Sequence, residues 1–443
     1  MKLTIFHTND IHSHLNTYAK ISQYIKDERS KLQHDSLYID IGDHIDLFHP
    51  LTEASQGTEN VKILNDSNVD VVTLGNNEGM TISHDSLNHL YDDAQFDVTC
   101  CNLFDLNSNL PNHLTSHVLK NVNGIKVCLI GLTAPFNHIY ETLDWKVTSP
   151  LLALKNEISQ VKEDYDVLIV MSHVGIFFDE QLCEECPEID VIFGAHTHHY
   201  FERGEEKNGV LMAAAGKYGH YVGQVDLEIE NNKVIHKEAQ ILDTTLLDEI
   251  PNNYEEKGKS LLDKPVLNRR ISLPRRLNSA SYTTDLLCES VLEFTEADCA
   301  IINAGLIVKE IDDSKITEYD IHQMLPHPIN TVSIELRGVE LKQIIYKAME
   351  QSYIDEVAIG FGFRGDIFGG YVFKNIGYIE STGQCFVKGI EVQDHEQYKL
   401  GTIDMYTFGR YFPILKDMNI NYIMPEFLRN IFEQKLIQKE KKV

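Results

Sequence analysis

The chain has 443 residues, more than one hydrophobic core usually accommodates, so we expect two domains. Its 43% hydrophobic and 24% charged residues are typical of a globular protein and exclude a disordered one. With 39 Lys and Arg against 67 Asp and Glu, the net charge of −28 predicts no binding to nucleic-acid polymers or anionic membranes. A small anionic ligand stays compatible with this charge if a bound metal reverses the local potential.

The amino terminus, MKLTIFHTND, turns polar too early for the apolar region of a signal peptide. No run of about 18 apolar residues follows, so we expect no membrane span and a cytoplasmic location. The eight cysteines lack a framework spacing, as reduced thiols do. The basic ending QKLIQKEKKV is interpreted as a solvated tail, and the oligomeric state stays open.

Apolar runs of strand length alternate with amphipathic stretches over the first 240 residues, which predicts an α/β layer structure. Strands are expected at residues 3–6, 37–41, 71–74, 96–100, 126–132, 167–171 and 190–194. Apolar residues from Tyr18 to Ile25 recur at helical spacing and predict a helix after the first strand. Asn123-Gly124 and the Asn pair at 231–232 predict hairpin turns.

Residues 243–276 are charged and punctuated by proline, which predicts an interdomain connection. We therefore expect one domain over residues 1–242 and a second over 277–443. The segment SASYTTDLLCESVLEF predicts a helix with Ser279 or Ser281 near its N-cap. The runs beyond it are richer in strand-forming and aromatic residues, so the second domain is expected to be α+β.

Polar segments follow five of the predicted strands where each one ends: HTNDIHSH, GDH, GNNEG, SHVG and AHTHH. Ligands of open α/β sheets bind outside the carboxyl ends of the strands, so these segments can converge on one crevice. Imidazole and carboxylate donors favour Zn, Mn, Fe or Co over Ca. An Asp can bridge two such ions about 3.5 to 4 Å apart, a pair that activates water and holds phosphoryl oxygens. The side chains that these segments deliver are Asp10, His12, Asp43, Asn76, His173, His196 and His198.

Each segment alone has a simpler interpretation. GDH is typical of a turn, and SHVG of a capped strand end. AHTHH could form a structural zinc site with Cys183 and Cys186, but His-x-His is too short for the usual finger spacing. Five such segments, each directly after an apolar run, favour a metal site over these simpler interpretations.

In this order, the five segments resemble the motifs of the 5'-nucleotidase family, two-domain metallophosphoesterases of the calcineurin-like superfamily. AAGKYGHYVGQVDLEI resembles the end of the family's catalytic domain, and LPHPINTVSIELRGVEL a segment of its C-terminal domain. The resemblance covers nearly the whole chain. It implies a four-layered αββα metallophosphoesterase sandwich, followed by a mobile α+β domain that brings the substrate to the metals.

The resemblance also implies two divalent metal ions, Mn, Zn or Fe. One would be held by Asp10, His12 and His198, the other by Asn76, His173 and His196, with Asp43 bridging both. Some family members have Gln where His198 stands, a change between two competent ligands. The implied reaction is attack of a metal-bound hydroxide on the phosphorus of a nucleotide or another small phosphate ester, without a phosphoenzyme.

The family motif usually has a His directly after the metal-binding Asn and an Asp three residues further on, where this chain has Asn77 and Met80. That His stabilises transition-state oxygens or protonates the leaving group, so its loss removes roughly 10² to 10⁴ in rate. Asn76, as a ligand that positions phosphate, and Asn77, as a hydrogen-bond donor that cannot give up a proton, remain the catalytic candidates. Candidates for a substitute acid are Glu78, His14 and His44, each of which could instead orient a ligand or lie on the surface.

Several functions remain open. A phosphohydrolase that prefers leaving groups needing little protonation, such as nucleoside diphosphates, triphosphates or aryl phosphates, is favoured because the whole metal set is present. A 2',3'-cyclic-nucleotide phosphodiesterase would use the same metals. A nucleotide sensor with poor turnover and a structural zinc protein are also compatible with these residues.

The C-terminal domain departs from the family as well. The family's Asn-Gly-Gly-rich stretch ends in an Arg that holds the nucleotide, whereas INAGLIVKE has Val308 there, which cannot replace a guanidinium. DMYTFGRYFP stands where the family has a stacking aromatic, with Met405 at the nominal position. Each aromatic candidate could either pack in the core or stack on a base. The candidate substrate contacts are Tyr371, Phe373, Tyr406, Phe408 and Arg410.

Overall fold

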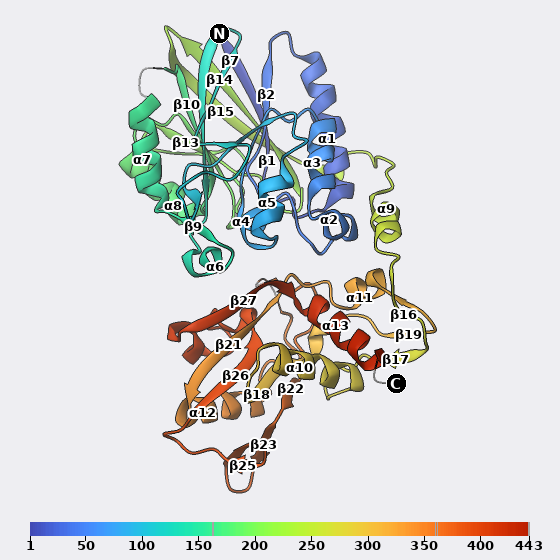
Figure 1. Cartoon of the computed structure of the whole chain (residues 1–443). Coiled ribbons are helices and arrows are strands. Elements are labelled where there is room, and N and C mark those ends of the chain that lie inside the picture. Colours follow the sequence, from blue (N-terminus) through green and yellow to red (C-terminus); the bar gives the residue numbers. More distant parts are fainter. Residues whose placement is uncertain (162–163, 359, 361, 442–443) are drawn as a thin grey trace. The chain divides into compact units, whose positions relative to one another are not determined.

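The computed structural model describes residues 1–161, 164–358, 360 and 362–441 (Figure 1). The chain divides into two compact units, Met1–Gly258 and Lys259–Val443. The division falls inside residues 243–276, the stretch that the sequence predicts as an interdomain connection.

Part of this stretch has regular structure. It contains helix α9 (Tyr254–Leu261) and strands β16 (Pro265–Leu267) and β17 (Ile271–Leu273). The two strands pair with β20 (Ile316–Thr317) and β19 (Ile311–Asp313), so they belong to the second unit. Runs of three residues carry too little alternation to separate a strand from a loop in a charged, proline-containing sequence.

Two β-sheets form the centre of the first unit. The seven-stranded sheet has the order β15-β14-β1-β2-β3-β4-β6, and the six-stranded sheet has the order β12-β13-β11-β10-β8-β7. Strands β1, β2, β3, β4 and β6 run parallel, as do β8, β10, β11 and β13. The first sheet comprises β1 (Lys2–Thr8), β2 (Ser36–Asp40), β3 (Val71–Thr73), β4 (Asp97–Thr99), β6 (Leu114–Thr115), β14 (Tyr221–Glu230) and β15 (Lys233–Asp243). The second comprises β7 (Val118–Val122), β8 (Ile125–Thr133), β10 (Val167–His173), β11 (Val191–Gly194), β12 (Glu205–Lys207) and β13 (Val210–Ala213).

Helices cover the outer faces of both sheets, as Figure 1 shows. On the first sheet, the hydroxyl of Tyr38 in β2 donates a hydrogen bond to the hydroxyl of Tyr18 in α1 at 3.0 Å. On the second, Leu154 of α7 and Leu182 of α8 share a buried cluster with Ile130 of β8. The helices of this unit are α1 (Leu15–Lys31), α2 (Pro50–Ser55), α3 (Thr58–Asp66), α4 (Asn76–Met80), α5 (His84–Leu90), α6 (Asn137–Thr142), α7 (Pro150–Val161) and α8 (Ile176–Glu185). A pair of short strands, β5 (Leu103–Asp105) and β9 (Trp145–Val147), lies apart from the two sheets.

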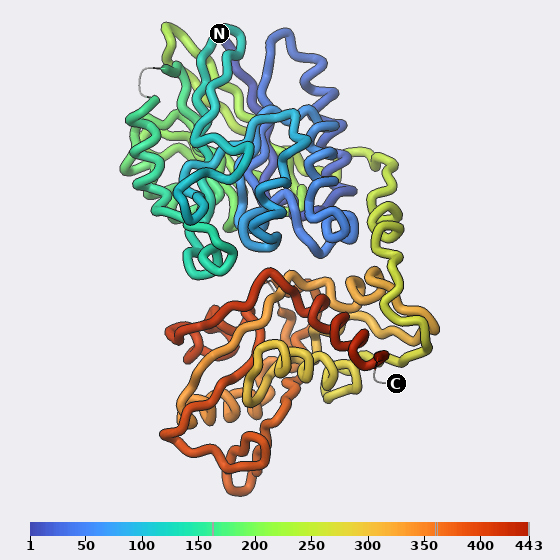
Figure 2. The backbone as a smooth tube through the Cα atoms, in the orientation of Figure 1, coloured from blue at the N-terminus to red at the C-terminus, as the bar shows by residue number. Residues whose placement is uncertain are grey.

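The core between the two sheets is apolar. Ile5 and Ile39 of the first sheet belong to one buried cluster with Leu129, Ile169 and Phe193 of the second. Figure 2 traces the path: the chain completes most of the first sheet, passes through the second, and returns to the first with β14 and β15. The predicted αββα sandwich is therefore confirmed.

Every strand that the sequence predicts in this unit is present, as β1, β2, β3, β4, β8, β10 and β11. The helix predicted after the first strand is α1, and both hairpin turns join antiparallel strands, β7 to β8 and β14 to β15. These runs were recognisable because parallel strands buried on both faces are continuously apolar.

The second unit is built on a five-stranded sheet of order β22-β18-β26-β21-β27, with α10 and α12 in its apolar core. Ser281 caps α10, since its Oγ accepts a hydrogen bond from the Thr284 backbone N–H at 3.2 Å. The sheet strands are β18 (Cys299–Asn303), β21 (Asn330–Arg337), β22 (Tyr371–Lys374), β26 (Gln397–Ile403) and β27 (Ile420–Phe427). A smaller sheet contains β23 (Ile376–Ile379), β24 (Gln384–Val387) and β25 (Ile390–Glu391). The helices are α10 (Tyr282–Phe294), α11 (Glu318–Met324), α12 (Gly338–Met349) and α13 (Leu428–Lys441).

The basic ending is not a solvated tail. Residues 434–441 continue α13, and Leu436 is buried in the core of the second unit. Lys435 pairs with Glu289 at 2.8 Å and with Glu293 at 2.5 Å. The tail interpretation was wrong because the lysines masked an apolar stripe at helical spacing; residues 442–443 lie outside the described part of the chain.

Within the described residues, the helices are all too short or too polar to cross a membrane. All eight cysteines are free and buried, in keeping with the expectation of reduced thiols.

Candidate metal centre

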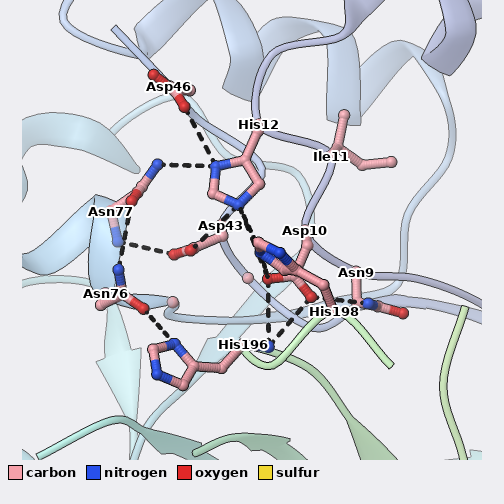
Figure 3. A network of polar contacts seen from close by, with 12 residues as sticks. Asn9, Asp10, Ile11, His12, Asp43, Asp46, Asn76, Asn77, His196 and His198 are labelled. Carbon is pink, nitrogen blue, oxygen red and sulfur yellow. Dashed lines mark hydrogen bonds and ion pairs between the residues drawn. The ribbon is translucent and has the colours of Figure 1, made fainter. Parts of the chain in front are cut away.

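The carboxyl ends of β1, β2, β3, β10 and β11 bring the polar segments together, as Figure 3 shows for several of them. Two glycines make the approach possible. A Cβ on Gly42, whose φ is +82°, would lie 2.2 Å from the backbone nitrogen of Gly75. A Cβ on Gly75 would lie 2.1 Å from Oδ1 of Asp43. The loops that carry Asp43 and Asn76 therefore touch backbone to backbone.

Several candidate ligands have left-handed backbone conformations. Asp10, His12 and Asp43 have φ values of 50°, 46° and 50°. His196 and His198 have values of 71° and 57°. Such conformations cost side-chain-bearing residues of order 1 to 3 kcal/mol each and concentrate at functional sites.

One group of donors is formed by Asp10, His12 and His198. Asp10 Oδ1 lies 3.9 Å from His12 Nε2 and 3.6 Å from His198 Nε2. The two imidazole nitrogens are 3.4 Å apart. Asp10 is fully buried and His12 is 6% exposed, whereas His198 is at the rim.

A second group adjoins the first and shares Asp10 with it. His173 Nε2 lies 3.4 Å from Asp43 Oδ2 and 3.9 Å from Asp10 Oδ1. Its Nδ1 donates to the carbonyl of Ile41 at 2.7 Å, which leaves Nε2 free to face the carboxylates. Asp43 Oδ2 is also 3.6 Å from His12 Nε2, so this oxygen lies between the two groups.

Asn76 and His196 complete the cluster. The Oδ1 atom of Asn76 lies 2.7 Å from Nδ1 of His196. The backbone N–H of His196 donates to both oxygens of Asp10, at 3.2 and 3.1 Å. All seven predicted metal ligands are thus brought to one place.

The electrostatics fit a divalent cation. Burial raises the pKa of Asp43, but His173, His12 and the backbone N–H of Asn77 together lower it more, so the pKa lies below its usual range. Burial lowers the pKa of His173, but Asp43 and then Asp10 raise it more, to about 10. The carboxylates thus draw positive charge to this point. Moreover, Nε2 of His173 is buried without a hydrogen-bond partner among the described residues, as a nitrogen reserved for a metal would be.

Asn77 occupies the position of the family's acid, and its amide is already engaged. Its Nδ2 donates to the carbonyl of Ile45 at 3.0 Å and lies 3.1 Å from Nδ1 of His12. Its backbone N–H donates to Oδ1 of Asp43 at 2.7 Å. With 8% exposure, Asn77 supports two candidate ligands in this structure.

Glu78 is a buried acceptor for the backbone of the metal loops. Its carboxylate accepts the N–H groups of Gly75 at 2.9 Å, Asp43 at 3.0 Å and Ile45 at 3.1 Å. Burial, together with the nearby Asp43, raises its pKa to about 7.

Burial disfavours the protonated form of both histidines considered as substitute acids. His44 is 2% exposed, and burial lowers its pKa to about 3. His14 stacks on Tyr218 with 4.1 Å between ring centroids, and its Nδ1 lies 3.2 Å from the carbonyl of Ile11. Burial lowers the pKa of His14 as well.

The candidate substrate contacts of the second unit differ in exposure. Tyr371 is 6% exposed and Tyr406 is fully buried, with its hydroxyl donating to Oδ1 of Asn303 at 2.9 Å. Their rings are therefore part of the core and present no open face for stacking here. Phe373 is partly buried, Phe408 is 40% exposed, and Arg410 is exposed and forms an ion pair with Glu356.

Sequence reasoning did not single out three residues that shape the centre. Asn9 donates to Oδ2 of Asp10 at 2.8 Å and to the carbonyl of Gly216 at 2.7 Å. Asp46 lies 3.2 Å from Nδ1 of His12, where it can orient the ring and favour Nε2 as the ligand. Tyr218 donates its backbone N–H to the carbonyl of Asp10 at 2.7 Å. The first two lie within or beside the polar segments at the strand ends, so their position was available as a signal.

Comparison with known proteins assigns the same class to both units. A family model for calcineurin-like phosphoesterases matches residues 3–200, and one for the 5'-nucleotidase C-terminal domain matches residues 262–414. The Bacillus subtilis (strain 168) protein YunD, described as an uncharacterized metallophosphoesterase, is 36% identical over 470 residues and covers 99% of each chain.

Solved structures share the fold over both units. A putative 5'-nucleotidase from Staphylococcus aureus, in complex with alpha-ketoglutarate, is 18% identical with a TM-score of 0.73, covering 98% of this chain and 96% of its own. The Haemophilus influenzae NAD nucleotidase is 17% identical with a TM-score of 0.67, covering 100% and 96%.

Fold and site together define a two-domain metal-dependent phosphoesterase. The chain belongs to the 5'-nucleotidase family of calcineurin-like metallophosphoesterases. The predicted class, a 5'-nucleotidase-like hydrolase, is thereby confirmed.

Proposed function

We propose that this protein hydrolyses nucleotides or other small phosphate esters with two divalent metal ions, Mn, Zn or Fe. The observation that carries the proposal is the convergence of seven imidazole, carboxylate and amide side chains at one place, where Nε2 of His173 faces the carboxylates of Asp43 and Asp10. In this assignment one ion is held by Asp10, His12 and His198, the other by Asn76, His173 and His196, with Asp43 between them.

Metal ions bound here would activate a water and neutralise phosphoryl oxygens during in-line displacement. The chain's own residues prepare this chemistry. Asp46 orients His12, Ile41 orients His173, and Glu78 fixes the loops of Asp43 and Asn76. Asn76 also positions the phosphate, while Asn77 keeps the ligands in place and supplies no proton.

The substrate preference follows from the missing acid. Without a proton donor, leaving groups that depart as stable anions are favoured, so aryl phosphates, nucleoside triphosphates and nucleoside diphosphates should react faster than monophosphates. Nucleotides fit the 5'-nucleotidase-type second unit. We further propose a role in nucleotide catabolism in the cytoplasm.

The test is hydrolysis by purified, Mn-loaded protein across aryl phosphate, nucleoside triphosphate, diphosphate and monophosphate, and 2',3'-cyclic substrates. Asp43→Ala should lose at least one metal by elemental analysis and nearly all turnover. Asp85→Ala is the matched control, because the Asp85 side chain is 92% exposed. Full metal content and full activity in Asp43→Ala would overturn the assignment.

Two different outcomes would redirect the function. Preference for 2',3'-cyclic substrates would make the protein a cyclic-nucleotide phosphodiesterase. Tight nucleotide binding without turnover would make it a sensor, a function that the engagement of the Asn77 amide with Ile45 favours.

A further inference from the structure

Lys217 is a cation beside the metal centre. The loop that carries it is fastened to the Asp10 segment at two points: the carbonyl of Gly216 accepts from Asn9 at 2.7 Å, and the N–H of Tyr218 donates to the carbonyl of Asp10 at 2.7 Å. Tyr218 has a φ of 59°, a conformation that a bulky side chain rarely adopts without a local requirement. The loop is therefore held in one position relative to the ligands.

The side chain of Lys217 lies against the ring of Tyr218. His14 stacks on the ring with 4.1 Å between centroids and 21° between planes, so it covers one face. The ammonium of Lys217 lies 4.6 Å from the centroid of the same ring. Because His14 covers one face of the ring, Lys217 lies over the opposite face. The same ring contacts His12, with 5.6 Å between centroids, and His198, with 6.3 Å. Lys217 and two candidate ligands thus surround one aromatic ring.

The charge of Lys217 is available to a ligand. Many lysines of this unit pair with carboxylates, but among the described residues none pairs with Lys217, which is only partly buried.

We propose that Lys217 binds the phosphate adjacent to the scissile phosphoryl group and so selects nucleoside diphosphates and triphosphates. This inference rests on the proposed function. In the step concerned, water forms the new P–O bond, the bond to the leaving phosphate breaks with its electron pair, and the water proton passes to product or solvent. The ammonium stabilises the negative charge that grows on the leaving phosphate, where Asn77 can supply no proton.

Three variants separate charge from structure. Lys217→Gln removes the charge, and Lys217→Arg keeps it. Lys126→Gln is the matched control, because Lys126 is exposed near the amino end of β8, away from the strand ends that carry the ligands. Thermal unfolding establishes that each variant is folded.

Two readouts are compared in Mn-loaded protein: kcat/KM for nucleoside diphosphate and aryl phosphate, and calorimetric binding of a non-hydrolysable methylene diphosphate analogue. Lys217→Gln should lower kcat/KM for the diphosphate by about tenfold and weaken binding of the analogue by about tenfold. A loss of this size is expected when one hydrogen bond to a charged group is removed. Aryl phosphate should change by less than about twofold, Arg should restore most of the loss, and Lys126→Gln should change neither readout.

Equal losses on both substrates, or unchanged affinity for the analogue, would overturn the proposal while leaving the proposed hydrolase intact. If the unmodified protein hydrolyses nothing, the proposed function fails instead. In that case analogue binding alone decides on Lys217: a loss of about tenfold in Lys217→Gln supports it, and no loss refutes it.

Discussion

Restoring the family's dyad tests whether the missing acid sets the substrate preference. Asn77 and Met80 lie three residues apart in α4, so their side chains project from the same face of the helix. In the double variant Asn77→His with Met80→Asp, the carboxylate at position 80 can orient the imidazole at position 77. General acid catalysis contributes roughly 10² to 10⁴, and we expect a gain of at least about tenfold for nucleoside monophosphates.

The structure also indicates how much stability the double substitution should remove. The substitution at Asn77 removes the hydrogen bond to the carbonyl of Ile45, worth about 1 kcal/mol, and places a larger ring at a position with 8% exposure. Overpacking of this kind costs about 1 to 3 kcal/mol. A total of about 2 to 4 kcal/mol lowers the unfolding midpoint by several degrees but leaves the fold intact.

The assay is the ratio of monophosphate to aryl phosphate turnover at matched Mn content, with each single variant as a control. The gain should appear only for the monophosphate, because an aryl leaving group needs little protonation. The double variant should also lose activity at alkaline pH as the new imidazole loses its proton. A folded, metal-loaded double variant without any gain would refute the claim that the acid limits monophosphate hydrolysis.

Three further predictions concern the supports of the site and of the second unit. Glu78→Gln turns an amide NH₂ towards at least one backbone N–H of the metal loops, so we expect about 1 to 3 kcal/mol less stability and weaker Mn binding by calorimetry; unchanged values would contradict its assigned role. Gly75→Ala places a methyl group 2.1 Å from Oδ1 of Asp43, so metal content by elemental analysis should fall, and a fully loaded variant would show that the loops can separate freely. Burial raises the pKa of Asp404 to about 7, above its unfolded value, so the native protein should lose stability as pH rises from about 4 to about 7. Asp404→Asn should remove that loss, by at most about 4 kcal/mol in chemical unfolding at pH 8, and an equal pH dependence in both proteins would contradict the argument.

The first unit was predictable because its information is local. Buried parallel strands such as β8 and β10 are continuous apolar runs, and Asn123-Gly124 has the composition of a tight hairpin. The strands β16 and β17 were not recognised, since three residues give no usable period and their partners are far along the chain. The prediction of a solvated tail for the basic ending was wrong for another reason. Lysines dominate its composition, whereas the burial of Leu436 depends on tertiary packing.

At the site, the sequence indicated which residues meet but not how they are used. Asp10, Asp43 and His173 could be placed at strand ends. In the structure, Nε2 of His173 lies 3.9 Å from Oδ1 of Asp10 and 3.4 Å from Oδ2 of Asp43. For Glu78 the sequence left an acid role and an orienting role open, and for Tyr218 it indicated no role, because the contacts of both residues involve backbone atoms supplied by other loops. Whether Tyr406 packs in the core or offers an open ring face for stacking depends on its burial. The pattern of neighbouring residues in the sequence does not reveal this burial.

The contacts of Asn77 explain how the cluster of candidate metal ligands can be retained without the family's acidic His at this position. What the cluster requires from this position is a backbone N–H for Asp43 and a polar side chain that fits beside His12 and Ile45, and asparagine provides both. Neither contact needs a titratable proton, so the supporting and acid roles of this position are separable. A chain that keeps the first and loses the second still benefits from metal activation, but only with substrates whose leaving group is stabilised by other means. The unpaired ammonium of Lys217, held over Tyr218 beside His198, offers such a means within the same unit.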